Sequence, residues 1–425
     1  MTDIGATLLD QCTKGMPGGV APFRLDAIGA HGWNVLNQDL PLPLAVLKDS
    51  ALTHNSAWMR DFLARSRVDI APHGKTTMAP QLFRRQLADG AWAISLATAQ
   101  QVQVARAYGV QRIILANQLI GPAFTRYVLA ELKAHPDFEF FCIVDSLENV
   151  AQLAEATRIA AIGRPLPVFL EGGMPGGRTG VRDRETGLAV ARAVRAAPGL
   201  ALRGVEGFEG LTSGTRAEAE AQVRGFLDLL VDLALACERE NLFAPGEVVL
   251  TAGGSAFYDM VIARLLHAGL SRPSRVITRS GCYLSHDSVS YRRFFADIVD
   301  RTPAAGQGGG LRPALEVWAY VQSRPQPDKV LLTMGKRDVS VDDMPVAQAW
   351  FRPGENATRE VPSGHRVVAH NDQHCHMMVP TDSPLTVGDM VGFGVSHPCL
   401  TFDKWQVICV VDDAYNVVSA IRTFF

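Results

Sequence analysis

The chain alternates short apolar runs with longer amphipathic stretches rich in alanine, glutamine and arginine, beginning near residue 42. The pattern recurs about eight times at a spacing of roughly 25 to 30 residues, which fits the size of β-strand–α-helix repeats. Such runs, apolar on both faces, are typical of parallel strands that helices cover. The runs are 44–47, 68–70, 91–96, 112–116, 139–144, 166–170, 202–207 and 247–251.

The stretches between these runs carry helix start and stop signals. In the segment 97–109, Thr98 is placed to cap the start of a helix and Gly109 to end it. Asp145 and Ser146 precede another such stretch in the same way. Eight strand–helix units predict an α/β fold with a closed (β/α)8 TIM-type barrel. A doubly wound open sheet is the alternative that the pattern leaves.

The pattern changes after about residue 275, where strand-like runs separated by turn signals replace the helix periodicity. A Gly- and Pro-rich segment at 302–310 reads as a loop. We therefore expect a barrel over residues 42–275 and a C-terminal, mostly β domain over 276–425, to which residues 1–41 contribute.

Composition and charge narrow the class of protein. The 425 residues are 47% hydrophobic and 20% charged, which is ordinary for a globular protein. A net charge of −2 gives no electrostatic reason to expect nucleic acid as a partner. We expect no membrane span, because no run of about 18 apolar residues occurs. The seven scattered cysteines and the absence of a signal-peptide pattern at the start favour free thiols and a cytoplasmic protein.

The most informative residue is Lys75, in the sequence Ala71-Pro72-His73-Gly74-Lys75-Thr76-Thr77 directly after the run that ends at Ile70. Catalytic groups of barrels lie at the carboxyl ends of strands. A lysine there is placed to hold an aldehyde cofactor as an imine, and pyridoxal phosphate is the common cofactor that needs one. A solvated loop lysine is the alternative interpretation.

The chain has two glycine-centred turns of interest, and the first is a candidate for holding the phosphate of such a cofactor. Gly253, Gly254 and Ser255 follow the run that we count as the eighth strand, where barrels often bind phosphate. Small residues there let backbone N–H groups approach an anion. The second turn, Arg279-Ser280-Gly281-Cys282-Tyr283, lies further along the chain. Either turn is also compatible with a plain glycine turn.

A possible metal site is encoded near the C-terminus by His397-Pro398-Cys399. In an extended segment, positions i and i+2 share a face. An imidazole and a thiolate on one face suit Zn²⁺. Two ligands alone leave a structural histidine beside a buried cysteine as the alternative. Upstream, His374 and His376 flank Cys375, and they form either a second metal cluster or a polar strand edge.

Together these motifs resemble the D-serine dehydratase and D-threonine aldolase group, relatives of the alanine racemase barrel and fold type III pyridoxal phosphate enzymes. The resemblance runs from before the barrel to Cys399. It implies that Lys75 carries the cofactor, that Gly281, Cys282 and Tyr283 form a second phosphate loop, and that zinc binds His397 and Cys399. Arg178, in Arg178-Thr179-Gly180-Val181, matches an arginine near the cofactor hydroxyl, although an acidic residue common in relatives is replaced here by Gly172.

The resemblance implies a lyase that acts on a small D-3-hydroxy amino acid, such as D-serine or D-threonine, and a homodimer. Aldolase relatives tend to carry an acid where this chain has Cys399, so we expect a dehydratase that releases a 2-oxo acid and ammonia. His73 and His374 are further candidate site residues. A retro-aldol lyase giving glycine and an aldehyde, and a non-catalytic cofactor-binding barrel, are the alternatives.

Overall fold

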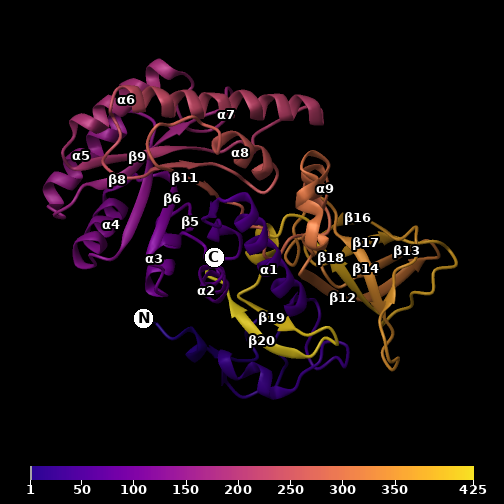
Figure 1. Ribbon diagram of the computed structural model, residues 1–425. Helices are drawn as coiled ribbons and strands as arrows, with labels where there is room; N and C mark the ends of the chain where they lie inside the picture. Colours follow the sequence, from indigo (N-terminus) through magenta and orange to yellow (C-terminus); the bar gives the residue numbers. More distant parts are fainter. Residues whose placement is uncertain (1) are drawn as a thin grey trace. The chain divides into compact units, whose positions relative to one another are not determined.

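The computed structural model describes residues 2–425, which form two compact units. The first, here called the barrel unit, comprises Arg60–Lys75 and Gln86–Gly281. The second, the β unit, comprises the chain up to Met59 together with Thr76–Arg85 and Cys282–Phe425 (Figure 1). These units are defined by compactness and not by independent folding. The predicted division into a barrel domain and a β domain near residue 275 therefore stays a prediction.

The barrel unit is built on eight parallel strands. The first strand pairs with the last, and its extension also bonds to the second: the Trp92 amide donates to Ile70 O (2.8 Å), and the Ser95 amide donates to Pro72 O (2.9 Å). The sheet is therefore closed, and the predicted (β/α)8 barrel is confirmed. The strands are β4 (Asp69–Ile70), β5 (Ile94–Leu96), β6 (Arg112–Gln118), β7 (Glu139–Val144), β8 (Leu166–Gly172), β9 (Leu200–Gly207), β10 (Val248–Thr251) and β11 (Ser274–Thr278).

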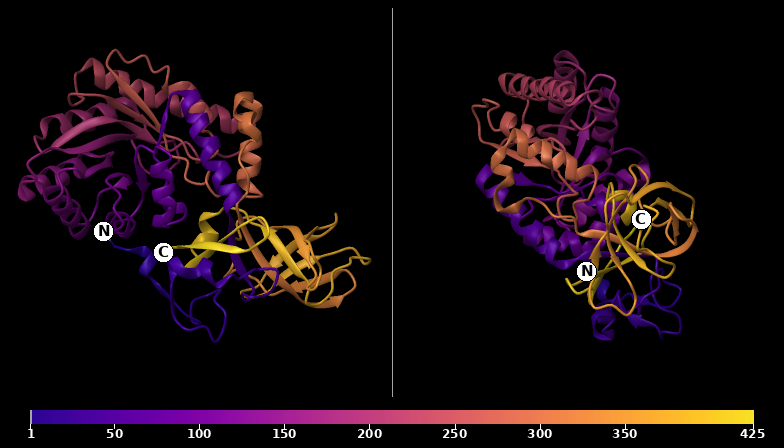
Figure 2. Two further views of the ribbon diagram at one scale, coloured as in Figure 1. Left: turned by 60° about the horizontal axis from the view of Figure 1, so that its bottom comes forward. Right: turned by 90° about the vertical axis from the view of Figure 1, so that its right-hand side faces the viewer.

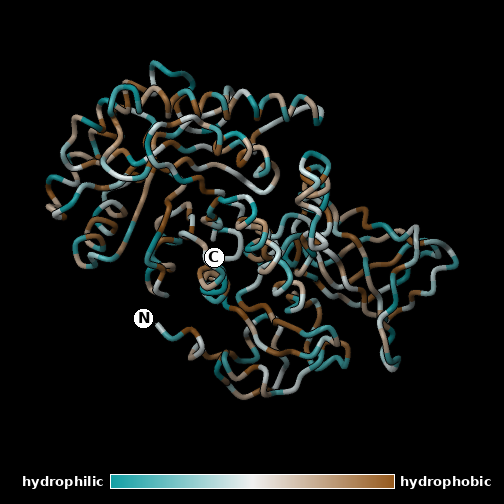
Figure 3. Tube along the Cα trace, in the orientation of Figure 1, coloured by the Kyte–Doolittle hydropathy of each residue, from teal (hydrophilic) through white to brown (hydrophobic). Residues whose placement is uncertain are grey.

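Helices cover the outer surface of these strands (Figure 1). Their starts follow the capping rules: the Thr98 side chain accepts a hydrogen bond from the Gln101 amide, and Thr215 forms a reciprocal capping box with Glu218. Along the longest helix, hydrophilic and hydrophobic turns alternate as expected of a helix with one buried face (Figure 3). The helices are α3 (Ala99–Ala107), α4 (Pro122–Ala134), α5 (Leu147–Ala160), α6 (Arg184–Ala196), α7 (Arg216–Arg239) and α8 (Tyr258–Leu265).

Apolar side chains from several strands fill the barrel interior, as they do in packed barrels of this size. The rings of Phe141 and Phe169 stack with their centroids 5.2 Å apart, and Trp92 packs against Phe141. The barrel is therefore a closed core, which leaves the loops at the strand ends as the place for chemistry. The buried members of this cluster are Ala71, Ala93, Ile114, Phe141, Ile143, Phe169, Val249 and Ile277.

The prediction that residues 44–47 form the first barrel strand is wrong. They belong to β3 (Leu44–Lys48), which pairs antiparallel with β12 (Leu315–Gln326) and parallel with β19 (Val407–Val411) in the β unit. A run that is apolar on both faces fits any fully covered strand, so periodicity could not show which sheet it joins. The strand count shifts by one: Lys75 follows the first barrel strand, and Gly253 follows the seventh. The eighth strand is β11, which was not among the predicted runs.

The β unit is mostly antiparallel, which confirms the predicted β character of the C-terminal region (Figure 2). Its main path runs β15-β14-β18-β12-β13-β17-β16, and β3 joins β12 to the hairpin of β19 and β20. The remaining strands are β1 (Leu8–Leu9), β2 (Phe23–Arg24), β13 (Lys329–Leu332), β14 (Val346–Phe351), β15 (Arg359–Glu360), β16 (Arg366–His370), β17 (Cys375–Met378), β18 (Met390–Gly394) and β20 (Val417–Arg422). The remaining helices are α1 (Asp49–Ser66), α2 (Pro80–Ala88), α9 (Ser290–Arg301) and α10 (Cys399–Phe402), with short 3-10 turns at Ile4–Ala6, Leu25–His31, Gly74–Thr76 and Pro303–Gly309.

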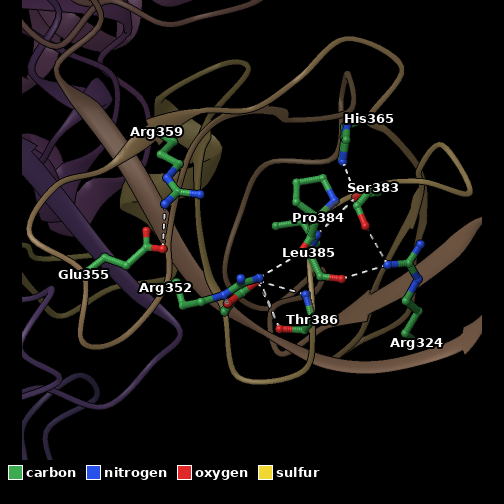
Figure 4. A network of polar contacts seen from close by, with 10 residues as sticks. Arg324, Arg352, Glu355, Arg359, His365, Ser383, Pro384, Leu385 and Thr386 are labelled. Atoms are coloured by element: carbon green, nitrogen blue, oxygen red, sulfur yellow. Dashed lines mark hydrogen bonds and ion pairs between the residues drawn. The ribbon is translucent and has the colours of Figure 1, made fainter.

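Two arginines hold the loop before β18 in place (Figure 4). The Arg324 guanidinium donates to the carbonyl oxygens of Ser383 and Leu385, each at 2.9 Å. Arg352 donates to Pro384 O at 2.7 Å and, with two nitrogens, to the carboxylate of Asp389 at 2.9 Å each. The Asp389 side chain is only 2% exposed, so its charge depends on these partners.

Replacing Arg352 by alanine should destabilise the β unit by about 1–3 kcal/mol, because the substitution leaves a buried carboxylate without its charged donor. The matched control is Arg359→Ala, since the Arg359–Glu355 pair in the same view is largely exposed (Figure 4). That control should cost less than about 1 kcal/mol. Urea denaturation of both variants measures the difference, and equal losses would contradict this account of the network.

Candidate active site

The structure places Lys75, which is exposed, in the turn that follows β4, beside the half-buried His73. Burial lowers the pKa of His73 well below its usual range, and the positive charges of Lys75, Arg279 and Arg178 lower it further. The imidazole is therefore neutral. Its Nδ1 atom is buried without a hydrogen-bond partner. The positive charges of Lys75 and Arg178, both predicted as site residues, thus lower the pKa of the same histidine as Arg279 does.

The turn after β10 binds an anionic group in this structure. The amides of Gly253 and Gly254 donate to the two carboxylate oxygens of Glu209, at 3.0 and 2.8 Å. The turn needs glycine twice, since Gly253 has a φ of +106° and a Cβ on Gly254 would lie 2.8 Å from the Phe208 ring. The Glu209 carboxylate occupies the position where two N–H groups would hold a phosphate oxygen.

Glu209 is a site residue that the sequence analysis missed. Its side chain is fully buried, and burial raises its pKa, although the two glycine amides and Arg279 oppose that rise. The neighbouring Phe208 ring lies under the Arg178 guanidinium at 4.8 Å. The loop after β9 therefore connects the predicted arginine with the predicted phosphate turn. The position of Glu209 after a barrel strand was the only signal in the sequence that could have identified it as a site residue.

The two predicted phosphate turns are also joined to each other. The Arg279 amide donates to Gly253 O at 3.1 Å, and the Ser280 hydroxyl donates to Gly254 O at 2.9 Å. The predicted residues Ser255 and Gly281 also lie in the barrel unit, whereas Cys282 and Tyr283 lie in the β unit. A cofactor-binding role for all of these residues stays a prediction.

Two further carboxyl groups end neighbouring strands of the barrel, and both were missed. Glu206, at the end of β9, pairs with the Arg279 guanidinium, and both side chains are buried. Glu171, at the end of β8, accepts hydrogen bonds from Gln118 Nε2 and Thr179 Oγ1, both at 2.7 Å. Burial, followed by the charge of Glu206, raises the pKa of Glu171 to about 8. Glu171 is therefore an acid that can hold a proton near neutral pH.

The raised pKa of Glu171 predicts a pH-dependent stability. The folded state binds this proton more tightly than the unfolded chain, in which the pKa of a glutamate is 4.5. The free energy of unfolding should therefore fall as the pH rises from 4.5 to about 8. Glu171→Gln removes the ionisation and should make stability less sensitive to pH in this window. Thermal unfolding at about pH 5 and about pH 9 tests the prediction. An unchanged difference between the two midpoints in Glu171→Gln would show that Glu171 does not titrate there.

A second group of predicted residues lies within the β unit. The sulfur atoms of Cys282 and Cys399 are 3.8 Å apart, and the Thr76 hydroxyl lies 3.6 Å from the first and 3.5 Å from the second. His397 Nδ1 hydrogen-bonds to the Asp342 carboxylate at 2.6 Å. Thr76 follows Lys75 directly in the chain.

The predicted extended geometry of His397-Pro398-Cys399 is wrong. His397 has a φ of +36°, and α10 begins at Cys399 because Pro398 starts a helical turn. The two side chains nevertheless hydrogen-bond to each other. Hydrogen bonds from Cys282 and then from His397 hold the pKa of Cys399 well below its usual range, and the bond to Cys399 raises the pKa of His397 to about 9. The lowered pKa favours the thiolate form of Cys399, which is the form that binds metals.

In residues 2–425, no three or more His, Cys, Asp or Glu side chains converge as a metal site. The alternative of a second metal cluster at His374-Cys375-His376 thus gains no support. His376 Nε2 instead hydrogen-bonds to Asn371 Oδ1 at 2.7 Å on β17, and the His374 carbonyl accepts from the Asn371 amide. A site role for His374 stays a prediction.

Comparison with known proteins decides the family. The family model described as alanine racemase, N-terminal domain, matches residues 48–262, just over half of the chain. The chain belongs to this family, the fold type III pyridoxal phosphate enzymes. A second model, described as a putative serine dehydratase domain, matches residues 314–411. The resemblance inferred from the sequence is confirmed.

Individual relatives agree with the family. D-threonine aldolase from Arthrobacter sp. is 26% identical over 384 residues, which are 87% of this chain and 89% of that protein. The structure of D-threonine aldolase from Filomicrobium marinum has a TM-score of 0.74 at 22% identity, covering 95% of this chain and 98% of that one. D-threo-3-hydroxyaspartate dehydratase from Delftia sp. HT23 has a TM-score of 0.71 at 20% identity, covering 92% and 99%. These structures share the fold.

The residues of the barrel unit fit the cofactor of this family. A lysine follows a barrel strand, a buried imidazole nitrogen lacks a partner, and a glycine turn already binds a carboxylate. The thiolate and imidazole of the β unit are the donor types that zinc prefers. Among residues 2–425, no helix is both long enough and apolar enough to cross a membrane.

Proposed function

We propose that this protein is a pyridoxal phosphate- and zinc-dependent lyase that converts a D-3-hydroxy amino acid, such as D-serine or D-threonine, into a 2-oxo acid and ammonia. The observation that carries the proposal is Lys75 at the end of a strand of a closed barrel, in a family that uses this cofactor. The proposal includes a homodimer in the cytoplasm, which rests on the family resemblance and on the sequence pattern.

In this proposal, Lys75 would hold the cofactor through its aldehyde, and its amine would serve as the base for the α-proton of the substrate. The amides of Gly253 and Gly254, which now bind the Glu209 carboxylate, would bind the cofactor phosphate in its place. By the family resemblance, Arg178 would lie near the cofactor hydroxyl. His73 stays neutral because it is buried among cations, so it can accept a hydrogen bond at one nitrogen and donate from the other. The cofactor, when bound, stabilises the negative charge that develops at the α-carbon.

His397 and Cys399 would hold the zinc ion, which would act as a Lewis acid toward the β-hydroxyl of the substrate. The Asp342–His397 hydrogen bond supports this assignment, because histidine ligands usually donate their other ring nitrogen to a carboxylate. In keeping with it, a cysteine-to-alanine variant of the related dehydratase is described as the metal-free form.

A retro-aldol lyase is the second candidate, and the relatives named D-threonine aldolase favour it. In that reaction the β-hydroxyl loses a proton and the bond between Cα and Cβ breaks. We favour dehydration because this chain carries Cys399 where aldolases of the group tend to carry an acid. The two reactions use the same cofactor and differ in which bond at the β-carbon is cleaved.

A product assay separates the two candidates. Purified protein supplied with pyridoxal phosphate and zinc is incubated with D-serine and D-threonine, and with the L-enantiomers as controls. Ammonia and a 2-oxo acid from the D-enantiomers alone are expected. Glycine with an aldehyde as the main products would replace the dehydratase with an aldolase. A protein that binds the cofactor but turns over no D-3-hydroxy amino acid would support the non-catalytic alternative.

A further inference from the structure

The contact between the thiols of Cys282 and Cys399 in the β unit is not explained by the roles given to these residues so far. Cys282 entered as a residue of a phosphate turn, and Cys399 as a metal ligand. Their sulfur atoms nevertheless lie 3.8 Å apart. Two sulfurs bound to one tetrahedral zinc ion at about 2.3 Å each lie about 3.8 Å from one another. The observed separation, at which the two thiols also hydrogen-bond to each other, is compatible with a shared zinc ion.

Besides their own hydrogen bond, a buried carboxylate joins the segments that carry the two thiols. Asp287, which is fully buried, accepts the His397 amide at 2.8 Å through one oxygen. Its other oxygen accepts the amides of Val289 and Tyr291, at 2.9 and 2.8 Å, at the start of α9. A second bond, from the Ser288 amide to Val395 O, joins the same two segments. The segments that carry Cys282 and Cys399 thus form one rigid frame.

The surroundings of the pair are compatible with a metal held by two sulfur atoms. The hydrogen bond to Cys399 and burial raise the pKa of Cys282, so this thiol would release its proton when a metal binds. Cys282 is 4% exposed, so water has little access to its sulfur. The Thr76 hydroxyl contacts both sulfurs, and the Tyr291 side chain hydrogen-bonds to Cys282. The Tyr291 hydroxyl can donate to a Cys282 thiolate and stabilise its charge, whereas the Thr76 hydroxyl accepts from Cys399 in this structure. His397, oriented by Asp342, adjoins Cys399 on the other side.

We propose that Cys282 is a zinc ligand together with Cys399 and His397. This inference rests on the proposed zinc dependence and adds a residue to it. Two thiolates and one imidazole leave a fourth position open, which is a known ligand set of catalytic zinc. Three such groups do not yet converge in residues 2–425, so the His397 imidazole has to move toward the metal, whereas the sulfurs are already at the required separation.

Cobalt substitution of the full-length protein tests the inference without relying on activity. Co²⁺ replaces zinc and gives a thiolate-to-metal charge-transfer band whose intensity grows with the number of sulfur ligands. Wild type, Cys282→Ser, Cys399→Ser and the control Cys12→Ser, whose thiol is exposed, are compared. Each ligand variant should lose about half of the band and bind zinc at least about 10-fold more weakly in chelator competition. The control should match wild type.

Three outcomes are distinguishable. An unchanged band and affinity in Cys282→Ser, with losses in Cys399→Ser, would overturn the role of Cys282 and leave the proposed function intact. A wild-type protein that binds neither metal would overturn the zinc dependence of the proposed function as well. Should Cys282→Ser fail to fold, X-ray absorption of the wild-type zinc protein counts its sulfur neighbours directly, and one sulfur instead of two would overturn the inference.

Discussion

Lys75→Ala should lose the yellow colour of the bound cofactor and at least about 100-fold of the activity, in line with the contribution of a positioned general base. The substitution removes the only amine of the turn after β4 and leaves the strand itself unchanged. The cofactor should still bind non-covalently, because Gly253 and Gly254 retain their amides. Absorption spectra before and after reduction with borohydride, together with the product assay, measure both losses.

The matched control for Lys75→Ala is Lys133→Ala, an exposed lysine of α4 whose ammonium group donates to Ala160 O. This control should keep both colour and activity, since it removes a lysine charge from the same unit without touching the strand ends. A Lys75→Ala enzyme that retains full activity would disprove the assignment of the catalytic lysine and, with it, the proposed function.

Most of the barrel could be predicted from the sequence, because seven of its eight strands lie in short apolar runs and several of its helices begin at a capping side chain. The eighth strand, β11, was missed. The identity of the first strand could not be predicted in this way. Val46 of β3 is as apolar and as buried as any barrel residue, yet it pairs with Glu316 and Cys409. Which sheet a covered strand joins depends on contacts hundreds of residues apart, and periodicity carries no information about them.

The residues of the candidate site also fall into those that could be predicted from the sequence and those that could not. Lys75 and the Gly253-Gly254 turn could be found because a lysine after a strand and paired glycines are local signals. Glu209 and Glu171 could not, since an acid near a strand end is common on surfaces and becomes informative only when the structure shows it buried. The pair of Cys282 and Cys399, 117 residues apart, was likewise visible only in three dimensions.

Removal of the metal should abolish the elimination while leaving the protein folded and the cofactor attached. A site with few protein ligands and an open position serves catalysis, whereas closed sites with four ligands stabilise folds. The β unit has an antiparallel sheet and buried, hydrogen-bonded groups such as Asp287 and Asp389, so we expect it to stay folded without a metal. Chelator-treated enzyme should regain activity when zinc is added back.

Cys399→Ala should reproduce this loss in the presence of zinc, lowering ammonia release from D-serine by at least about 10-fold, the usual cost of disturbing a metal site. Its cofactor spectrum and thermal midpoint should match those of Cys12→Ser, because Lys75 and the glycine turn are untouched. Two thiolates donate charge to zinc and temper its acidity, so the metal would act chiefly by orienting the β-hydroxyl for departure. Full activity in Cys399→Ala, or in enzyme from which the metal has been removed, would mean that protein groups alone assist the departure of hydroxide. The neutral His73 and the protonated Glu171 would then be the residues to test.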